Sequence, residues 1–263
     1  MTATARSTVL GLTRSETHGY VWSEGESAIG PLPSVTTIIG VLDKSGPLIG
    51  WAKRVTAEAA VDNRDALTGW VELGGRAGAI SLLTKAASQK RDKAADVGTR
   101  VHALAESVAR GQVVELTEEE RPFLAAYQRF RDDFHPRQIA AEEMVVSLEY
   151  EYGGTLDDIV EIMGEIWLLD KKTSRGCYPE TALQLSAYGN ADFIGRANDP
   201  TRYAIPKIDQ YGVLHLRPEG YELIPYDVTP RTFEAFLHAR SLFEWRETQA
   251  PRVMGQPLGR AIK

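Results

Sequence analysis

The chain has 263 residues, of which 43% are hydrophobic and 25% are charged, with 23 glycines and 13 prolines. These values are close to the average of soluble globular proteins, so they exclude a collagen, a coiled coil and a disordered acidic tail. The formal net charge, from 30 basic and 36 acidic residues, is −6. Taken alone, this total argues against nucleic acid as a partner, because phosphate binding needs clustered Lys and Arg. It does not decide the question, since charge acts through individual faces and a metal-binding carboxylate site is itself negative.

The cysteine content and the hydropathy of the chain indicate its cellular context. Cys177 is the single cysteine, so an intramolecular disulfide and a four-cysteine metal or iron–sulfur site are excluded. No stretch approaches ~18 consecutive apolar residues, and the segment from Met1 to Thr17 is polar. We therefore expect no secretion, no membrane span and a cytoplasmic location.

The first half of the chain is predicted to be an arm followed by helices. The aromatic stretch from His18 to Trp22, with the Gly-rich turn behind it, indicates a small hairpin or extended arm. Ser34 and Ser45 are favourable N-caps. Helices are predicted over residues 34–42, 45–61, 79–90 and 97–110, with the glycines at 74, 75 and 78 interrupting the run.

A further helix is predicted behind Thr117. Thr117 and Glu120 have the spacing of a capping box, in which each side chain bonds the other residue's backbone. Aromatic residues then recur at helical spacing, which is typical of a core face. They are Phe123, Tyr127, Phe130 and Phe134.

The second half is predicted to be a sheet with two helices. Strands are expected over 144–150, 155–163 and 165–172, with turns at Gly153–Gly154 and Gly164, and further strands over 202–208, 212–217 and 221–226. Helices are expected over 179–194 and from Thr229 to Arg246, where Pro230 suits the first helical position. The sum is an α/β protein with a helical N-terminal elaboration over residues 1–93 and a core over 94–263, forming one continuous domain.

Two of the predicted strands carry carboxylates at places where buried strands normally exclude charge. Asp157 lies on one strand, and the next ends in Asp170, Lys171 and Lys172 after an apolar run. Side chains alternate along a strand, so Lys172 shares a face with Asp170 while Lys171 points away. Of the nine lysines, only Lys172 has an acidic residue two positions earlier. Two converging carboxylates with an adjacent ammonium can bind a divalent cation and a phosphodiester substrate. The alternative interpretation of the same residues is a solvated strand end with a surface ion pair.

Two helical segments add candidate site residues. Gly98, His102 and Glu106 lie four residues apart, so they share one helix face, where His102 can ligate a metal and Glu106 can hold the imidazole ring in place. A lone helical histidine is more often structural. Gln184 and Tyr188 are also four apart, and they can hydrogen-bond the carboxylate site or contact a phosphate or base.

Together these segments resemble one family. Four segments occur in an order that is similar to the motif order of the RecB-type branch of the PD-(D/E)XK nucleases. They are Gly98–His102–Glu106, then Gly154-Thr155-Leu156-Asp157, then Asp170-Lys171-Lys172-Thr173-Ser174, then Gln184-Leu185-Ser186-Ala187-Tyr188. That branch includes phage-encoded and CRISPR-associated exonucleases and a mitochondrial genome-maintenance exonuclease. The resemblance covers about residues 94–194, and the upstream segment from Pro33 to Ile39, with Trp51, resembles the phage-type members.

The resemblance implies a fold, a cofactor and a set of roles. The fold is a restriction-endonuclease-like mixed sheet flanked by helices. The cofactor is Mg²⁺ or Mn²⁺, without the iron–sulfur cluster that some members carry. The metal ligands are His102, Asp157, Asp170 and the main-chain carbonyl of Lys171. Lys172 orients or activates the attacking water, and Glu106, Gln184 and Tyr188 support the site, while Asp158 is the neighbour most easily mistaken for a ligand.

The position of DNA is predicted from a local excess of basic residues. Lys90, Arg91, Lys93 and Arg100 precede or lie within the His102 helix, and Arg175 follows the Asp170 strand. The alternative is an ordinary solvated helix face.

The expected function is a metal-dependent DNA exonuclease in recombination, repair or phage replication. DNA ends or single strands are the expected partner, with recombination or replication proteins as further candidates and the host cytoplasm as the location for a phage protein. The alternatives are an endonuclease, a non-catalytic DNA-binding subunit with the same fold, and a phosphoesterase for small molecules. Polarity, strand preference, metal number and oligomeric state do not follow from the sequence.

Overall fold

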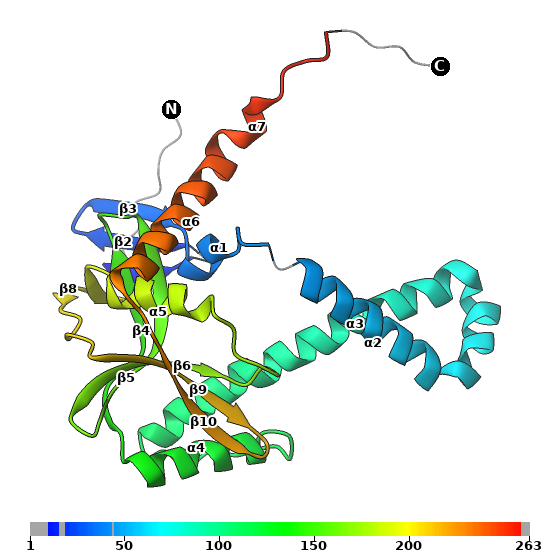
Figure 1. The fold of residues 1–263 in the computed structure, drawn as a ribbon, viewed down its shortest axis with the longest axis horizontal. Coiled ribbons are helices and arrows are strands. Elements are labelled where there is room, and N and C mark those ends of the chain that lie inside the picture. Colours follow the sequence, from blue (N-terminus) through cyan, green and yellow to red (C-terminus); the bar gives the residue numbers. More distant parts are fainter. Residues whose placement is uncertain (1–9, 16–18, 44, 259–263) are drawn as a thin grey trace. The chain divides into compact units, whose positions relative to one another are not determined.

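A computed structural model describes residues 10–15, 19–43 and 45–258. The chain divides into two compact units, one formed by residues 1–42 and 126–263 and the other by residues 43–125 (Figure 1). This division differs from the expected boundary between residues 93 and 94, because the first 42 residues belong to the same unit as the sheet. His18, part of the predicted arm, lies outside the described residues.

A mixed sheet of seven strands forms the centre of the first unit. Its strands are β4 (Arg137–Ser147), β5 (Tyr152–Ile162), β6 (Glu165–Lys172), β7 (Phe193–Arg196), β8 (Asp199–Tyr203), β9 (Gln210–Arg217) and β10 (Gly220–Tyr226). They are ordered β10-β9-β6-β5-β4-β7-β8, with β6 and β9 parallel and the other neighbours antiparallel. The expectation of an α/β protein with a mixed central sheet is confirmed.

The turn between β4 and β5 is displaced from its predicted position. Gly153 and Gly154 were expected to form it, but both lie inside β5, and the turn covers residues 148–151. A Cβ on Gly153 would lie 2.6 Å from the Tyr20 ring, and one on Gly154 would lie 2.3 Å from Cε1 of Tyr188. The two glycines are therefore required for close packing of aromatic rings against the strand rather than for a turn.

Two other predicted elements end earlier than expected. The helix predicted over 179–194 is α5 (Thr181–Gly189), because Phe193 and Ile194 pair with β4 instead. Of the strand predicted over 202–208, only residues 202 and 203, at the end of β8, are in a strand. Pro206, which has no N–H to donate to a neighbouring strand, lies in the segment that follows. The predicted turn at Gly164 is present, with a φ of 85° that favours glycine.

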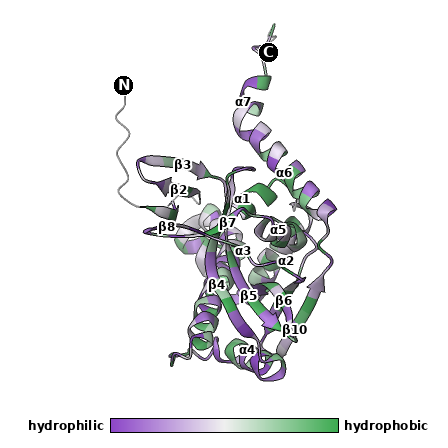
Figure 2. Cartoon of the chain, turned by 90° about the vertical axis from the view of Figure 1, so that its left-hand side faces the viewer, coloured by the Kyte–Doolittle hydropathy of each residue, from purple (hydrophilic) through white to green (hydrophobic). Residues whose placement is uncertain are grey.

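Helices α1 (Val35–Ile39), α5 and α6 (Pro230–Thr248) pack with the sheet around the main core. Ser34 caps α1 by accepting a hydrogen bond from the Thr37 amide at 3.0 Å, and Thr229 with Thr232 forms a capping box for α6. Phe236 of α6 is fully buried and meets Tyr152 edge-on, with ring centroids 5.0 Å apart. Beyond this anchor, α6 and the short α7 (Ala250–Val253) run away from the sheet in both views (Figure 1, Figure 2).

The N-terminal arm is a small antiparallel sheet within the first unit. It consists of β1 (Gly11–Arg14), β2 (Tyr20–Glu24) and β3 (Ser27–Leu32). Leu12, Tyr20 and Trp22 are buried with Phe193 of β7, and the Trp22 and Phe193 rings meet at 4.8 Å. The predicted hairpin is therefore present, and its apolar face belongs to the sheet unit.

The second unit is helical. Helix α2 (Ser45–Asp62) agrees with the prediction over 45–61. The helices predicted over 79–90 and 97–110 are wrong as separate elements, because they belong to one helix, α3 (Arg64–Ala109), which departs from helical geometry at Gly75, where φ is 65°. Of the three glycines expected to interrupt, only Gly75 does so; Gly74 and Gly78 are tolerated within the helix.

Helix α4 (Arg121–Phe134) continues from the second unit into the first. The Glu120 carboxylate accepts a hydrogen bond from the Thr117 amide at 2.9 Å, which is half of the predicted capping box, and the helix begins four residues after Thr117. Tyr127 and Phe130 are buried, as the aromatic stripe predicts. Among the described residues, no helix is long and apolar enough to cross a membrane.

We predict that Gly154→Ala destabilises the protein by about 1–3 kcal/mol, because the new methyl group overlaps the Tyr188 ring. Urea unfolding measures the change. In a Tyr188→Ala background the same substitution is expected to cost much less, since the two residues are in contact. Gly50→Ala, in α2 where a Cβ meets nothing within 4 Å, is the matched control and is expected to be neutral or mildly stabilising. Equal costs for the two glycines would contradict the packing role of Gly154.

Candidate functional site

The candidate site lies where β5 and β6 separate. Their pairing runs from Ile162–Glu165 to Asp158–Leu169, and β6 then continues to Lys172 paired only with β9. Asp157 and Asp170 are the next residues on the two strands. The Lys171 amide donates to Oδ2 of Asp157 at 2.6 Å, so a side chain replaces the backbone ladder at this point.

Asp170 is the most densely bonded member of the site. The Lys172 ammonium contacts its two carboxylate oxygens at 2.9 and 2.7 Å. The Gln184 side-chain amide donates to Oδ1 at 2.8 Å and to the Tyr188 hydroxyl at 3.3 Å. Two of the sequence-predicted residues, Lys172 and Gln184, therefore bond Asp170, and Gln184 links Tyr188 to them.

The protonation states of Lys172 and Tyr188 depend on their burial and on the neighbouring carboxylates. Burial lowers the pKa of Lys172, but the charge of Asp170 and their hydrogen bond outweigh burial, so its pKa lies above the ordinary value. Burial, with the charges of Asp170 and Asp157, raises the pKa of Tyr188 well above its usual range. Lys172 is thus an ammonium at neutral pH, and Tyr188 is a neutral phenol that can donate a hydrogen bond.

A second charged cluster forms around Lys171. Its side chain is fully buried, and the ammonium lies 2.9 Å from Oδ2 of Asp158 and 3.5 Å from Oε1 of Glu142. Gln138 also donates to Asp158 at 3.1 Å. Burial raises the pKa of Asp158, an effect that Lys171 opposes. Asp158 therefore pairs with Lys171, and its neighbour Asp157 is the residue that faces the Asp170 strand.

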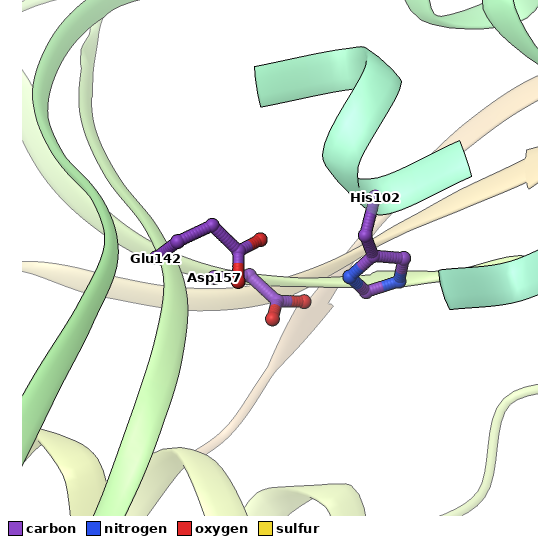
Figure 3. Close-up of side chains that lie close together, drawn as sticks. All are labelled: His102, Glu142 and Asp157. Carbon is purple, nitrogen blue, oxygen red and sulfur yellow. The ribbon is translucent and has the colours of Figure 1, made fainter. Parts of the chain in front are cut away.

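Glu142 is a site residue that the sequence analysis missed. The pairs Ala141–Asp158 and Glu143–Leu156 place it opposite Asp157 on β4, and carboxylate oxygens of Glu142 and Asp157 lie within 4.8 Å of each other (Figure 3). Its φ of 52° is unusual for a non-glycine residue, a strain that concentrates at functional sites. The strand was predicted to start at Met144, which excluded it. The two consecutive acidic residues at 142 and 143 were the sequence feature that could have identified it as a site residue.

His102 and Glu106 lie on α3, in the other unit. Glu106 forms an ion pair with Arg110, one turn further along the helix. The residues that the first unit itself brings together are Asp157, Asp170, Lys171, Lys172, Gln184 and Tyr188.

The donor set of the first unit fits a hard divalent cation. Carboxylate oxygens are the ligands that Mg²⁺ and Mn²⁺ prefer. Oxygens of Glu142 and Asp157 lie within 4.8 Å of each other, while the Asp170 carboxylate on β6 is bonded to Lys172 and Gln184. The N–H and C=O of one strand residue point to the same side, and the Lys171 amide points to Asp157, so its carbonyl faces β5 as well. Within the described residues no thiolate set accompanies them, since Cys177 is the single cysteine.

Most of the predicted DNA-binding residues are paired with carboxylates. Within the second unit, Lys90 pairs with Glu58, Arg91 with Asp92, Lys93 with Glu119 and Arg100 with Glu120. All four cationic side chains are well exposed, but Glu120 is buried. The pairs of Lys90, Arg91 and Lys93 are therefore surface pairs of low energy that a phosphate can replace. The local basic excess is therefore smaller than the sequence suggests.

Arg175 lies in the loop between β6 and α5, within the first unit. It lines a groove of about 600 Å³ with Cys177 and Tyr226. The loop is tied to the β9–β10 hairpin at both ends: His215 Nε2 contacts the Ser174 carbonyl at 2.8 Å, and the Tyr226 hydroxyl donates to the Tyr178 carbonyl at 3.1 Å. The sequence analysis did not single out His215, since nothing in its neighbourhood predicts a partner 41 residues away.

Comparison with models of protein families and with curated proteins gives no match. The functional conclusion therefore depends on the residues of the site and on their arrangement.

We predict that Lys171→Met lowers the free energy of unfolding by about 3–5 kcal/mol at neutral pH, because it leaves the buried Asp158 charge uncompensated. Burial raises the pKa of Asp158 above its unfolded value. The folded state then takes up a proton more readily than the unfolded state as pH falls, so the difference from the parent protein is expected to shrink in mild acid.

Urea unfolding of both proteins at neutral and mildly acidic pH measures this difference. The control is Asp158→Asn/Lys171→Met, which removes the Asp158 carboxylate while Glu142 remains, and it is expected to lose the part of the pH dependence that comes from Asp158. A penalty for Lys171→Met that does not change with pH would show that Asp158 is not the group left unpaired.

Proposed function

We propose that this protein is a metal-dependent DNA nuclease, an exonuclease that hydrolyses phosphodiester bonds in recombination, repair or phage replication. The observation that carries the proposal is the convergence of Asp157, Asp170 and Lys172 where β5 and β6 separate, with Gln184 bonded to Asp170. The sequence resemblance to the RecB-type nucleases supplies the reaction. The restriction-endonuclease-like fold is part of the same proposal, supported by the mixed sheet.

The residues proposed to hold the metal are Asp157, Asp170, the Lys171 carbonyl and His102. A bound Mg²⁺ or Mn²⁺ would lower the pKa of a water molecule and stabilise negative charge on the phosphoryl group. Glu142 joins this set on structural grounds, since it stands opposite Asp157. His102 joins it through the resemblance and through the affinity of imidazole for Mn²⁺ more than for Mg²⁺.

The remaining residues position these groups. Lys172 keeps its proton beside Asp170, so it is proposed to orient the attacking water and to offset charge on the phosphate rather than to act as a base. Gln184 donates one hydrogen bond to Asp170, which fixes the rotamer of that carboxylate, and donates a second to the Tyr188 hydroxyl. Glu106 is proposed to support His102 from the next turn of α3.

DNA is the proposed partner, held by Arg175 beside the site and by Lys90, Arg91, Lys93 and Arg100 of α3. A net charge of −6 and the paired state of the α3 cations indicate a narrow basic track. Binding is therefore expected to depend on the metal and on site contacts, and to be weak in a chelator.

The test is incubation with Mg²⁺ or Mn²⁺ and DNA labelled at one end or the other, linear against circular. Release of label from one end only supports an exonuclease and gives its polarity. Cleavage of circles supports an endonuclease. Binding without cleavage supports a non-catalytic subunit, and preference for small phosphoesters in competition supports another class of hydrolase.

We predict that Asp170→Asn lowers kcat by more than about a hundredfold, because loss of an outer partner alone typically costs ~10–100-fold. Gln184→Ala, which removes such an outer partner, is expected to lie within that range. Glu165→Gln is the matched control on the same strand, where an exposed carboxylate bonds Gln210. Full nuclease activity of purified, folded Asp170→Asn would rule out the proposed site.

We predict that His102→Gln weakens Mn²⁺ binding about tenfold or more without lowering the melting temperature, if the imidazole completes the ligand set. Asp157→Asn serves as the positive reference, and His238→Gln, at an exposed position of α6, serves as the control. Titration calorimetry with Mn²⁺ measures the affinity in each case. An effect of Asp157→Asn with none for His102→Gln would place His102 outside the metal set.

A further inference from the structure

A groove of the first unit lies away from the carboxylate site, between β10 and the start of α6. Its volume is about 880 Å³. Tyr150, Tyr211, Tyr226, Phe233 and Leu237 give it aromatic and apolar walls. We call it the β10–α6 groove. A site of this size with such walls is typical of a binding site rather than of a packing defect.

The charge of the β10–α6 groove has one sign. Asp209, Asp227 and Glu234 line it, and none of its described lining residues is positively charged. Asp209 is partly compensated by the exposed Lys207 at 3.6 Å. A polyanion is repelled from such a surface, so the groove is unsuited to DNA and suited to a segment that is cationic and apolar.

The chain itself contains such a segment. We call residues 252–263 the C-terminal segment. It carries Arg252, Arg260 and Lys263 and no acidic residue. In its described part, residues 252–258, the apolar side chains of Val253, Met254 and Leu258 are 64%, 89% and 107% exposed. Three cations and a run of exposed apolar residues match three carboxylates and aromatic walls.

The geometry of α6 separates this segment from the groove of its own chain. Thr229, Pro230, Phe233, Glu234 and Leu237, at the start of α6, line the groove. Thr248, the last residue of α6, is 11 residues beyond Leu237, so the end of the helix lies about 17 Å beyond the groove. Both views show α6 and α7 continuing outward from the sheet (Figure 1, Figure 2). Residues 252–258, the described part of the C-terminal segment, are not among the residues that line the groove of their own chain.

We propose that the C-terminal segment of one copy of this chain docks in the β10–α6 groove of a second copy. The contact joins two different surfaces, so it is head-to-tail, and it closes into a ring or extends into a filament according to its rotation. The proposal does not depend on the nuclease activity, because it uses neither the carboxylate site nor DNA.

The test is the mass of the full-length protein in solution. Sedimentation at increasing concentration is expected to show self-association that weakens as salt rises, because the attraction is largely electrostatic. Asp227→Lys/Glu234→Lys reverses charge in the groove, and Arg252→Glu/Arg260→Glu reverses it in the segment. Each is expected to weaken association by about tenfold or more, equivalent to about 1.4 kcal/mol.

Mixing the two charge-reversal variants distinguishes this segment-to-groove contact from association through any other surface. The groove variant retains a native segment, and the segment variant retains a native groove, so a mixture of the two is expected to associate although each alone does not. Glu26→Lys/Glu219→Lys, with the same charge change outside the groove, is the control and is expected to associate like the parent. Melting temperatures confirm that each variant is folded.

Other outcomes overturn the proposal. A parent protein that stays monomeric at all concentrations places the segment in its own groove or in no groove. Association that survives both charge reversals belongs to another surface. Failure of the mixture to associate shows that segment and groove do not meet.

Discussion

The end of pairing between β5 and β6 is the constraint on which the site depends. Where two strands pair, their backbone N–H and C=O groups bond each other. Where β5 and β6 separate, these buried polar groups must bond other partners, because an unpaired polar group away from water is unfavourable. Asp157 meets one such need by accepting from the Lys171 amide, and Asp170 is enclosed by Lys172 and Gln184. Neither arrangement contributes much net stability, because desolvation offsets the attraction. What they provide is a fixed position for carboxylates at a strand end.

The same separation explains why two lysines in sequence have different roles. Alternation along β6 sends Lys171 to Asp158 and Lys172 to Asp170. Lys171 is fully buried and joins three strands, since Glu142, Asp158 and Lys171 come from β4, β5 and β6. Lys172 is partly exposed and can reach a substrate. One ammonium therefore holds the strands together beneath the site, and the other belongs to the site surface.

Much of the fold followed from local patterns, while the failures came from tertiary contacts. Strand alternation and the turn at Gly164 predicted β5 and β6, and caps at Ser34 and Thr229 predicted α1 and α6. Gly153 and Gly154 have the composition of a turn, but they serve the rings of Tyr20 and Tyr188, which come from distant parts of the chain. No local signal reports such a contact. The continuous α3 was missed because glycines inside a helix cost little and only Gly75 leaves helical geometry.

The candidate site shows the same division. Asp157, Asp170, Lys172, Gln184 and Tyr188 were predicted from motif spacing, because strand and helix periodicity fix which residues share a face. Glu142 and His215 were not, since each acts through a partner on another strand. Glu142 needs the β4–β5 register to meet Asp157, and His215 needs the parallel β6–β9 pair to reach Ser174. Register between strands is set by the whole sheet rather than by a local sequence.

Electrostatics also decides where a cationic segment of this chain can bind. The carboxylates of the candidate site attract cations, but Lys171 and Lys172 already lie in contact with Asp158 and Asp170. In the β10–α6 groove none of the described lining residues is positive, so Asp227 and Glu234 keep their attraction for an incoming cation. The two proposed partners, DNA at the candidate site and a cationic segment in the β10–α6 groove, therefore use different parts of the first unit. A net charge of −6 conceals this division, because it sums over both faces.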